Sequence, residues 1–215
     1  IGPDDKGTQS VLMLQPLIPF SLNSDWNVIS RTIMPIIDQK NITPGSGSQS
    51  GLGDTLQTFF FSPKKLGPSG LIWGAGPAFL LPTASDDLLG GGKWGAGAAV
   101  VVLKQKGPWT IGTLVNQIWS VGGDKDREDL NYTYFEPFAS YTTPKAVTYS
   151  IYTESTYDWV QSEWSIPIVA QVAKVFKIGE QSVSIGIGVR YWVESTEIGP
   201  EGWSANFNVR FAFPK

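Results

Sequence analysis

Residues 181–213 read QSVSIGIGVRYWVESTEIGPEGWSANFNVRFAF, and this stretch decides the fold. In each half of it, apolar and polar residues alternate with a period of two. One face of the first half carries Val183, Ile185, Ile187, Val189, Tyr191 and Val193, and one face of the second carries Trp203, Ala205, Phe207, Val209, Phe211 and Phe213. Successive side chains of a β-strand point to opposite faces, whereas a helix would scatter these residues around its circumference. The stretch therefore predicts two β-strands, each with a continuous apolar face.

The same alternation extends over the rest of the chain. It predicts eleven strands, at about 8–20, 26–37, 51–62, 69–82, 92–104, 108–121, 129–142, 146–158, 163–176, 181–194 and 202–213. Soluble strands usually have about 5–6 residues, whereas a tilted strand that crosses a bilayer needs about 9–11. No apolar run approaches the roughly 18–20 residues of a transmembrane helix. The pattern predicts an all-β fold, a transmembrane antiparallel up-and-down β-barrel.

The connections between these segments alternate between short and long. Bacterial barrels have short periplasmic turns and longer extracellular loops, and single-chain bacterial barrels have an even number of strands. The last long connection precedes the final strand, which places the C-terminus in the periplasm. We therefore predict about twelve strands, of which eleven lie in this sequence and the first is missing from it or supplied some other way. We expect residues 1–215 to be a single outer-membrane barrel domain that is incomplete at its N-terminus.

The composition excludes several classes of function. Only 16% of the residues are charged, against about 25% in ordinary soluble domains. Cysteine and histidine are absent, which excludes disulfides, thiolate or imidazole metal ligands and Ser-His-Asp triads. The net charge of −3 with no basic stripe argues against nucleic acid as a partner. We predict no catalytic residue, no metal and no cofactor, although Glu136 and Glu154 lie on adjacent strands as carboxylates do in glycosidases.

The tryptophans lie near the strand ends. Trp26, Trp73 and Trp109 fall near the inner ends of their strands, and Trp94, Trp119, Trp164 and Trp203 fall near the outer ends. Tryptophan favours the boundary between lipid and water, where one side of the ring is wet and the other apolar. This placement predicts two aromatic girdles.

Charged residues within the strands indicate which face lines the lumen. An Arg or Lys that faces lipid at the midplane costs about 2–4 kcal/mol, so we expect mid-strand charges to point inward. The candidates for lining the lumen and setting its selectivity are Arg31, Glu136, Glu154, Arg190, Arg210, Asn27, Gln57, Tyr134, Tyr152, Asn206 and Asn208. The charges form either a structural network of opposite charges or a selectivity ring. The small apolar inner faces of 69–82 and 92–104 either pack tightly or leave room for an apolar ligand.

Several short blocks carry a family resemblance. They are DWNVISRTI at 25–33, GLGD at 51–54, FFFSP at 59–63, WGAGP at 73–77, LPTA at 81–84, GPWT at 107–110, NQIWS at 116–120 and GPEGW at 199–203. In combination they resemble the bacterial family named for the MetA pathway of phenol degradation. The resemblance implies an outer-membrane barrel of the transporter type and a connection with aromatic compounds. It brings no binding or catalytic residues.

Two functions follow as hypotheses. The first is an outer-membrane channel through which small molecules, including hydrophobic or aromatic compounds, pass passively; its partners are outer-membrane lipids and a small-molecule solute. The alternative is a closed structural or assembly barrel that oligomerises in the outer membrane without transport. A homo-oligomer is compatible with either hypothesis.

Overall fold

A computed structural model describes residues 7–42, 45–197 and 199–213, and within them the chain is built from antiparallel strands. No helix in these ranges is long and apolar enough to span a bilayer. The strands are β1 (Thr8–Leu14), β2 (Leu17–Ser21), β3 (Trp26–Lys40), β4 (Ser48–Leu52), β5 (Thr55–Pro63), β6 (Leu71–Leu81), β7 (Lys93–Lys106), β8 (Trp109–Gly123), β9 (Asn131–Thr142), β10 (Val147–Thr153), β11 (Ser155–Asp158), β12 (Glu163–Ile178), β13 (Gln181–Glu194) and β14 (Gly202–Ala212).

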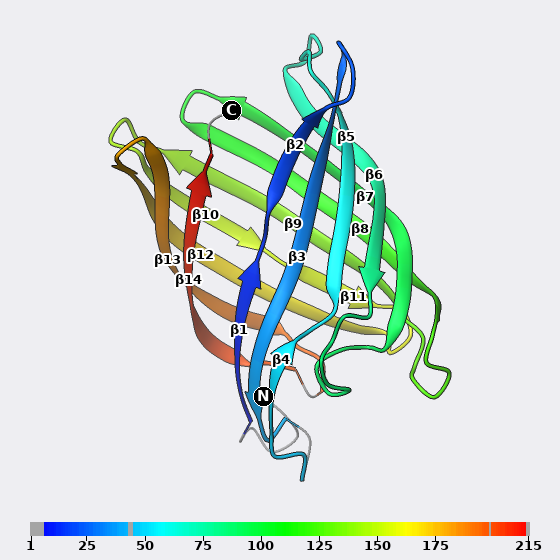
Figure 1. The fold of residues 1–215 in the computed structure, drawn as a ribbon. Coiled ribbons are helices and arrows are strands. Elements are labelled where there is room, and N and C mark those ends of the chain that lie inside the picture. Colours follow the sequence, from blue (N-terminus) through cyan, green and yellow to red (C-terminus); the bar gives the residue numbers. More distant parts are fainter. Residues whose placement is uncertain (1–6, 43–44, 198, 214–215) are drawn as a thin grey trace.

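The fourteen strands make eleven long segments of one curved sheet (Figure 1). The order β1-β3-β5-β6-β7-β8-β9-β10-β12-β13-β14 follows the chain, while β2 and β4 both pair with β3 and β11 pairs with β9 and β12. Thus β1 with β2, β4 with β5, and β10 with β11 are pieces of single long segments. The eleven segments predicted from alternation are confirmed, with ends that differ by a few residues.

Proline explains most of the irregularities. Pro16 separates β1 from β2, and its carbonyl oxygen accepts a hydrogen bond from the Thr32 amide at 3.1 Å. The β12–β13 register shifts between Ile166 and Pro167. The ladders are also interrupted beside Pro77 and Pro137. A proline has no amide hydrogen for the ladder, so each of these positions loses a strand-to-strand bond.

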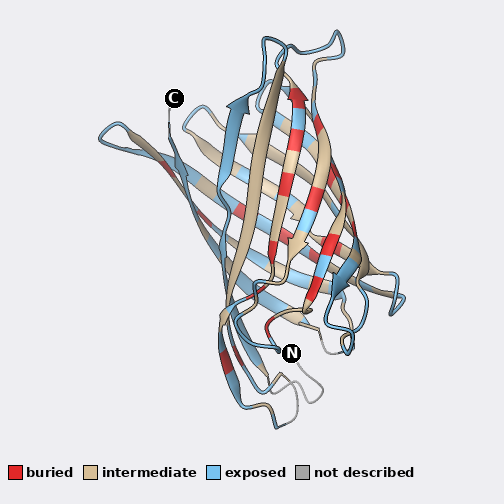
Figure 2. Ribbon diagram, turned by 45° about the vertical axis from the view of Figure 1, so that its right-hand side comes forward, coloured by how far each residue is buried: buried red, intermediate tan, exposed pale blue. Residues whose placement is uncertain are grey.

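The two faces of the sheet differ. Buried residues alternate with exposed ones along β5 to β8 (Figure 2). Across these strands Phe60, Ala78, Ala99, Leu114 and Ile118 form one buried cluster. The opposite face is apolar and exposed, and its central residues include Ile187, 60% exposed, and Phe207, 67% exposed. We call the first face inner and the second outer, because the sheet curls around the first.

The ends of the sheet also differ, and we name them by their connections. The turn end holds residues 22–25, 64–70, 107–108, 143–146 and 179–180, and the loop end holds 41–47, 82–92, 124–130, 159–162 and 195–201. Most loop-end connections are longer than those at the turn end, but 64–70 at the turn end has seven residues and 159–162 at the loop end has four.

The first and last segments run in the same direction, from the loop end to the turn end, as the arrows of β1, β2 and β14 show in Figure 1. This follows from eleven segments that each reverse the direction of the one before. In the part of the chain that the structure describes, no ladder joins β14 to β1 or β2. A twelfth strand stays a prediction.

Candidate functional site: the inner face of the barrel

The inner face has an apolar half and a polar half. On β5 to β8 it presents the buried cluster around Phe60 and Ile118, together with the small residues Gly74, Gly97 and Ala99. On β9 to β14 it presents tyrosines, charged groups and amides. Strand pairing fixes this division, because residues directly opposite in an antiparallel pair share a face.

Two carboxylates face each other on the polar half. Tyr152 pairs with Phe138 and Ser155 pairs with Phe135. The same register places Glu154 directly across from Glu136. Like charges in this position repel and destabilise a strand pair, so the structure must compensate them.

Each carboxylate has its own compensation. Glu154 forms a salt bridge with the guanidinium of Arg190, and the two side chains are 32% and 26% exposed. Glu136 accepts a hydrogen bond from the Tyr134 hydroxyl at 2.8 Å. Arg31, on the far side of the lumen, and Arg210 also attract the Glu136 carboxylate. Three arginines, from β3, β13 and β14, therefore share the inner face with two glutamates, from β9 and the β10–β11 junction.

An amide network continues the polar half toward the turn end. Asn208 Nδ2 donates to Gln171 Oε1 at 2.8 Å, and Asn206 Nδ2 donates to the Tyr152 hydroxyl at 3.3 Å. The Tyr152 hydroxyl in turn lies 3.4 Å from Gln171 Oε1. The side-chain oxygens of Asn206 and Asn208 are buried and accept no hydrogen bond from a described residue. The network thus keeps unused acceptors at the inner wall.

The structure places ten of the eleven predicted lumen residues on the inner face. Arg31 pairs with buried Thr58 and Asn27 with buried Ser62, while the others follow the register of β9 to β14. Gln57 is the exception, because the register places it on the outer face and not on the predicted inner face. It pairs with Thr32 on the outer face, where its side chain accepts a hydrogen bond from Thr32 Oγ1 at 2.6 Å and donates to Ser30 Oγ at 3.0 Å.

Gln171 and Asn116 are among the buried polar residues of the inner face that were not predicted. Gln171 is 8% exposed and joins the amide network, and Asn116 is 3% exposed beside the apolar cluster. The alternation along β12 would have placed Gln171 on the inner face. Gln171 lies between Val169 and Ala173, on the face opposite to Ala170 and Val172.

The loop end is tied together above this lumen. The Arg127 guanidinium donates to the carbonyl oxygens of Asp87, at 2.7 Å, and Gly90, and Asp54 accepts from the amides of Ala84 and Gly91. Lys93 is buried and forms a salt bridge with Asp129 at 3.1 Å. Hydrogen bonds from Lys93 and Ser120 hold the pKa of Asp129 below its usual value of 3.8. Loops 82–92 and 124–130 therefore behave as one packed unit.

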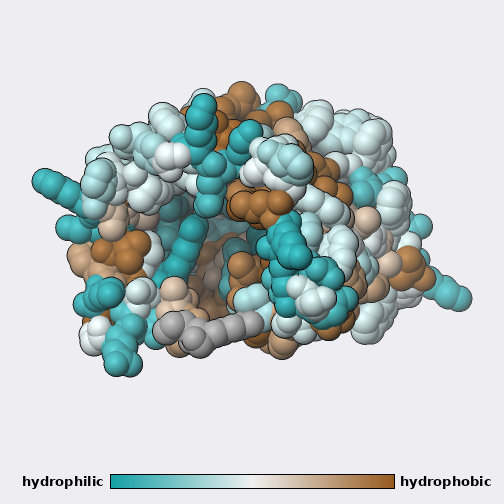
Figure 3. All heavy atoms as spheres, turned by 90° about the horizontal axis from the view of Figure 1, so that it is seen from above, coloured by the Kyte–Doolittle hydropathy of each residue, from teal (hydrophilic) through white to brown (hydrophobic). Residues whose placement is uncertain are grey.

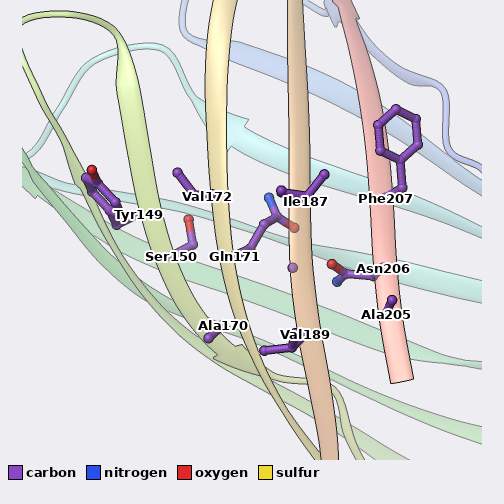
Figure 4. Close-up of a pocket in the computed structure, with 11 residues that line it drawn as sticks. Tyr149, Ser150, Ala170, Gln171, Val172, Ile187, Val189, Ala205, Asn206 and Phe207 are labelled. Carbon is purple, nitrogen blue, oxygen red and sulfur yellow. The ribbon is translucent and has the colours of Figure 1, made fainter. Parts of the chain in front are cut away.

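A groove of about 790 Å³ lies in the wall formed by β10, β12, β13 and β14 (Figure 4). Pairing groups its residues in rungs: Tyr149, Val172, Ile187 and Phe207 form one, and Ala170, Val189 and Ala205 the next. Both rungs belong to the outer face. Two alanines between larger side chains hollow the wall, so this groove is apolar and distinct from the lumen.

The described residues contain no cluster of acidic side chains suited to hold a metal ion. No protein-family model and no curated protein matches the sequence. The fold is similar to that of a solved structure described as the COG4313 outer membrane channel from Pseudomonas putida F1. The TM-score is 0.70 with 18% sequence identity over 96% of this chain and 85% of that one. The likeness confirms the antiparallel β-barrel fold, and membership of the phenol-degradation family stays a prediction.

Proposed function

We propose that the protein is a channel of the bacterial outer membrane, through which small molecules cross passively along the lumen. The observation that carries the proposal is the division between the two faces. Apolar side chains such as Ile187 and Phe207 cover the outer face, while Arg190 and Asn206 on the same strands turn inward. Water would oppose this arrangement and a bilayer favours it, because polar groups are costly in hydrocarbon.

The aromatic side chains support this placement in the membrane. At the turn end Trp26 packs against Trp73, with ring centroids 5.9 Å apart, and Trp109 against Tyr141 at 5.0 Å. At the loop end Tyr191 packs against Trp203 at 4.9 Å. Aromatic rings gather at both boundaries of a membrane protein. The two girdles would hold the barrel at a fixed depth.

The solute class follows from the two halves of the inner face. The half around Phe60 and Ile118 offers an apolar surface, and the half around Glu154 and Asn206 offers charges and amides. A small solute with a hydrophobic or aromatic body and a polar group fits both. Arg31, Arg190, Arg210, Glu136 and Glu154 would set the preference among such solutes. Nothing in this arrangement requires a catalytic step or a cofactor.

Accessibility of introduced cysteines tests the lumen directly, because the chain has no cysteine of its own. Asn206→Cys places a thiol on the inner face of the sheet. Phe207→Cys, at the next residue of the same strand, places one on the outer face. In planar bilayers, a charged methanethiosulfonate reagent should reduce the current through Asn206→Cys and leave Phe207→Cys unchanged. Liposome swelling with neutral solutes of increasing size gives the passage limit. Absence of both current and swelling would contradict the channel.

One observation favours the alternative, a closed structural barrel. Ala78 and Ile118 on the inner face are completely buried, so this half of the wall is already packed. A closed barrel would assemble with other copies through its outer face. It predicts folded oligomers, detected by crosslinking in membranes, that show no solute flux.

A further inference from the structure

The charges of the barrel are sorted along its axis. The turn end carries Lys64, Lys65, Lys104, Lys106, Lys145, Lys174 and Lys177, all exposed, in the turns or beside them. Lys104 is beside a turn because it pairs with Leu71, the first residue of β6, and Lys174 because it pairs with Val147, the first of β10. Among the described residues only Asp25 and Glu180 oppose the seven lysines at this end, which leaves a net five positive charges there.

The loop end has the opposite sign. Its cations are Lys40, Lys93, Lys125 and Arg127. Its carboxylates among the described residues are Asp38, Asp54, Asp86, Asp87, Asp124, Asp126, Glu128, Asp129, Asp158, Glu163, Glu194, Glu197 and Glu201, so that four cations against thirteen carboxylates leave nine negative charges. The small net charge of the chain therefore hides two opposite and separated charges.

The turn-end lysines are available to a partner. Lys65 lies 3.9 Å from a carboxylate oxygen of Asp25, a loose contact between exposed side chains, and among the described residues no other turn-end lysine forms a salt bridge. Viewed from this end, hydrophilic side chains surround the rim of a central hollow (Figure 3). The chain itself thus leaves most of the positive charge uncompensated.

Three of these lysines stand on the outer face, at the level of the aromatic pairs. Lys104 pairs with Ile111, Lys106 with Trp109 and Lys174 with Ile185, and all three partners belong to the outer face. A lysine at this level keeps its stem on the apolar wall while its ammonium group reaches the headgroup layer. The lysines and the turn-end tryptophans therefore occupy one continuous band.

We propose that this band binds the headgroups of anionic phospholipids. The lipid phosphate supplies the charge that the lysines lack, and Trp73 and Trp109 place the band at the depth where headgroups lie. The loop end, being acidic, repels the same lipids. The protein thus prefers anionic lipid at one end only, which fixes its orientation relative to a leaflet that contains such lipid. The proposal rests on the membrane-spanning fold proposed above.

Tryptophan quenching by brominated lipids tests the lipid proposal by comparing two tryptophans of the same strand. Trp109 and Trp119 stand at the two ends of β8 on the outer face, and each is 49% exposed. Full-length variants that keep only one of them, with the other tryptophans replaced by Phe, are reconstituted in phosphatidylcholine–phosphatidylglycerol vesicles in which one lipid is brominated. Brominated phosphatidylglycerol should quench Trp109 roughly twofold more strongly than brominated phosphatidylcholine. Trp119 should show no such preference, or the reverse.

Charge variants test whether the turn-end lysines, and not other parts of the surface, cause the lipid preference at Trp109. Lys104→Gln/Lys106→Gln/Lys174→Gln should abolish the preference at Trp109, as should 1 M salt, because screening shortens the range of surface charges to about 3 Å. Lys40→Gln/Lys125→Gln at the loop end is the matched control and should change nothing at Trp109. Lipids retained by the wild-type protein in native mass spectrometry give a second measurement that needs no tryptophan replacement.

The outcomes distinguish the two proposals. Equal quenching of Trp109 by both lipids, or a preference that survives the triple substitution, overturns the lipid site and leaves the channel standing. Failure of either lipid to quench either tryptophan means that the barrel does not sit in the bilayer, which overturns both.

Discussion

At the scale of single residues, the pair Glu136 and Glu154 makes the inner face sensitive to the loss of Arg190. Arg190→Ala leaves Glu154 opposite a like charge in a partly buried place, and we expect a loss of about 1–3 kcal/mol in the free energy of unfolding. Adding Glu154→Gln removes the repulsion and should restore part of that loss. Urea unfolding in vesicles measures both variants. If the double variant loses the sum of the separate Arg190→Ala and Glu154→Gln effects, Arg190 and Glu154 do not interact.

Asp129 gives the loop end a pH dependence of known sign. The pKa of this carboxyl is depressed in the folded protein by Lys93, so its contribution to stability is complete above the unfolded pKa of about 3.9. The contribution is lost as the pH falls through the lower, folded pKa. Asp129→Asn should therefore destabilise the protein at pH 7 and match the wild type near pH 2. Asp126→Asn, whose carboxylate has no salt bridge among the described residues, is the control in the same unfolding series.

Residue faces were predictable only where the alternation is clean. Arg190, Arg210, Asn206 and Asn208 stand in strands with an uninterrupted apolar face, and the register places them on the inner face. Gln57 precedes Thr58 and the run Phe59–Phe61, where three aromatic residues in succession give no period of two. The structure resolves this ambiguity by turning Phe60 inward and Gln57 outward.

At the scale of elements, Gly97 permits the close pairing of β7 and β8. A Cβ atom at this position would collide with the carbonyl oxygen of Gln117 in the neighbouring strand. We expect Gly97→Ala to lower the folded fraction and to cost about 1–3 kcal/mol, since the backbone has to shift. Ala98→Val, which enlarges the exposed outer face one residue away, is the control. The band shift between boiled and unboiled samples in gel electrophoresis reports folding, and equal shifts would contradict the steric explanation.

The existence of the strands was more predictable than their continuity. The segment at 181–194 is the same in sequence and structure, because its alternation runs from end to end. The segment at 146–158 divides into β10 and β11 at Glu154, a division that its alternation alone does not indicate. Pro137 lies opposite Thr153, beside this break, but it belongs to a different segment, and only the register brings the two together.

At the scale of the whole molecule, the outer face should tolerate charge far less than the inner face. Ile187→Arg places a guanidinium at the middle of β13 facing outward, and we expect a loss of about 2–4 kcal/mol in a bilayer. Asn206→Arg, on the inner face of the neighbouring strand, should cost much less. Unfolding from vesicles measures the difference. Similar losses for the two variants would mean that the outer face does not meet hydrocarbon.

The identity of the solute lies beyond what alternation can predict. Parity tells which residues face the lumen, but the shape of the passage depends on how far apart distant strands lie, such as β3 with Arg31 and β9 with Glu136. That separation follows from the curvature of the whole sheet. A pattern with a period of two residues carries no information about that curvature.

The shared direction of β1 and β14 has a consequence of simple parity. In a closed ring of strands in which every neighbour is antiparallel, the number of strands must be even. With eleven segments, the first and the last both run from the loop end to the turn end, and they face each other across the seam. A strand that closes the ring between them with antiparallel pairing has to run from the turn end to the loop end. Hydrogen bonds along both of its sides would then satisfy the two free edges of the sheet.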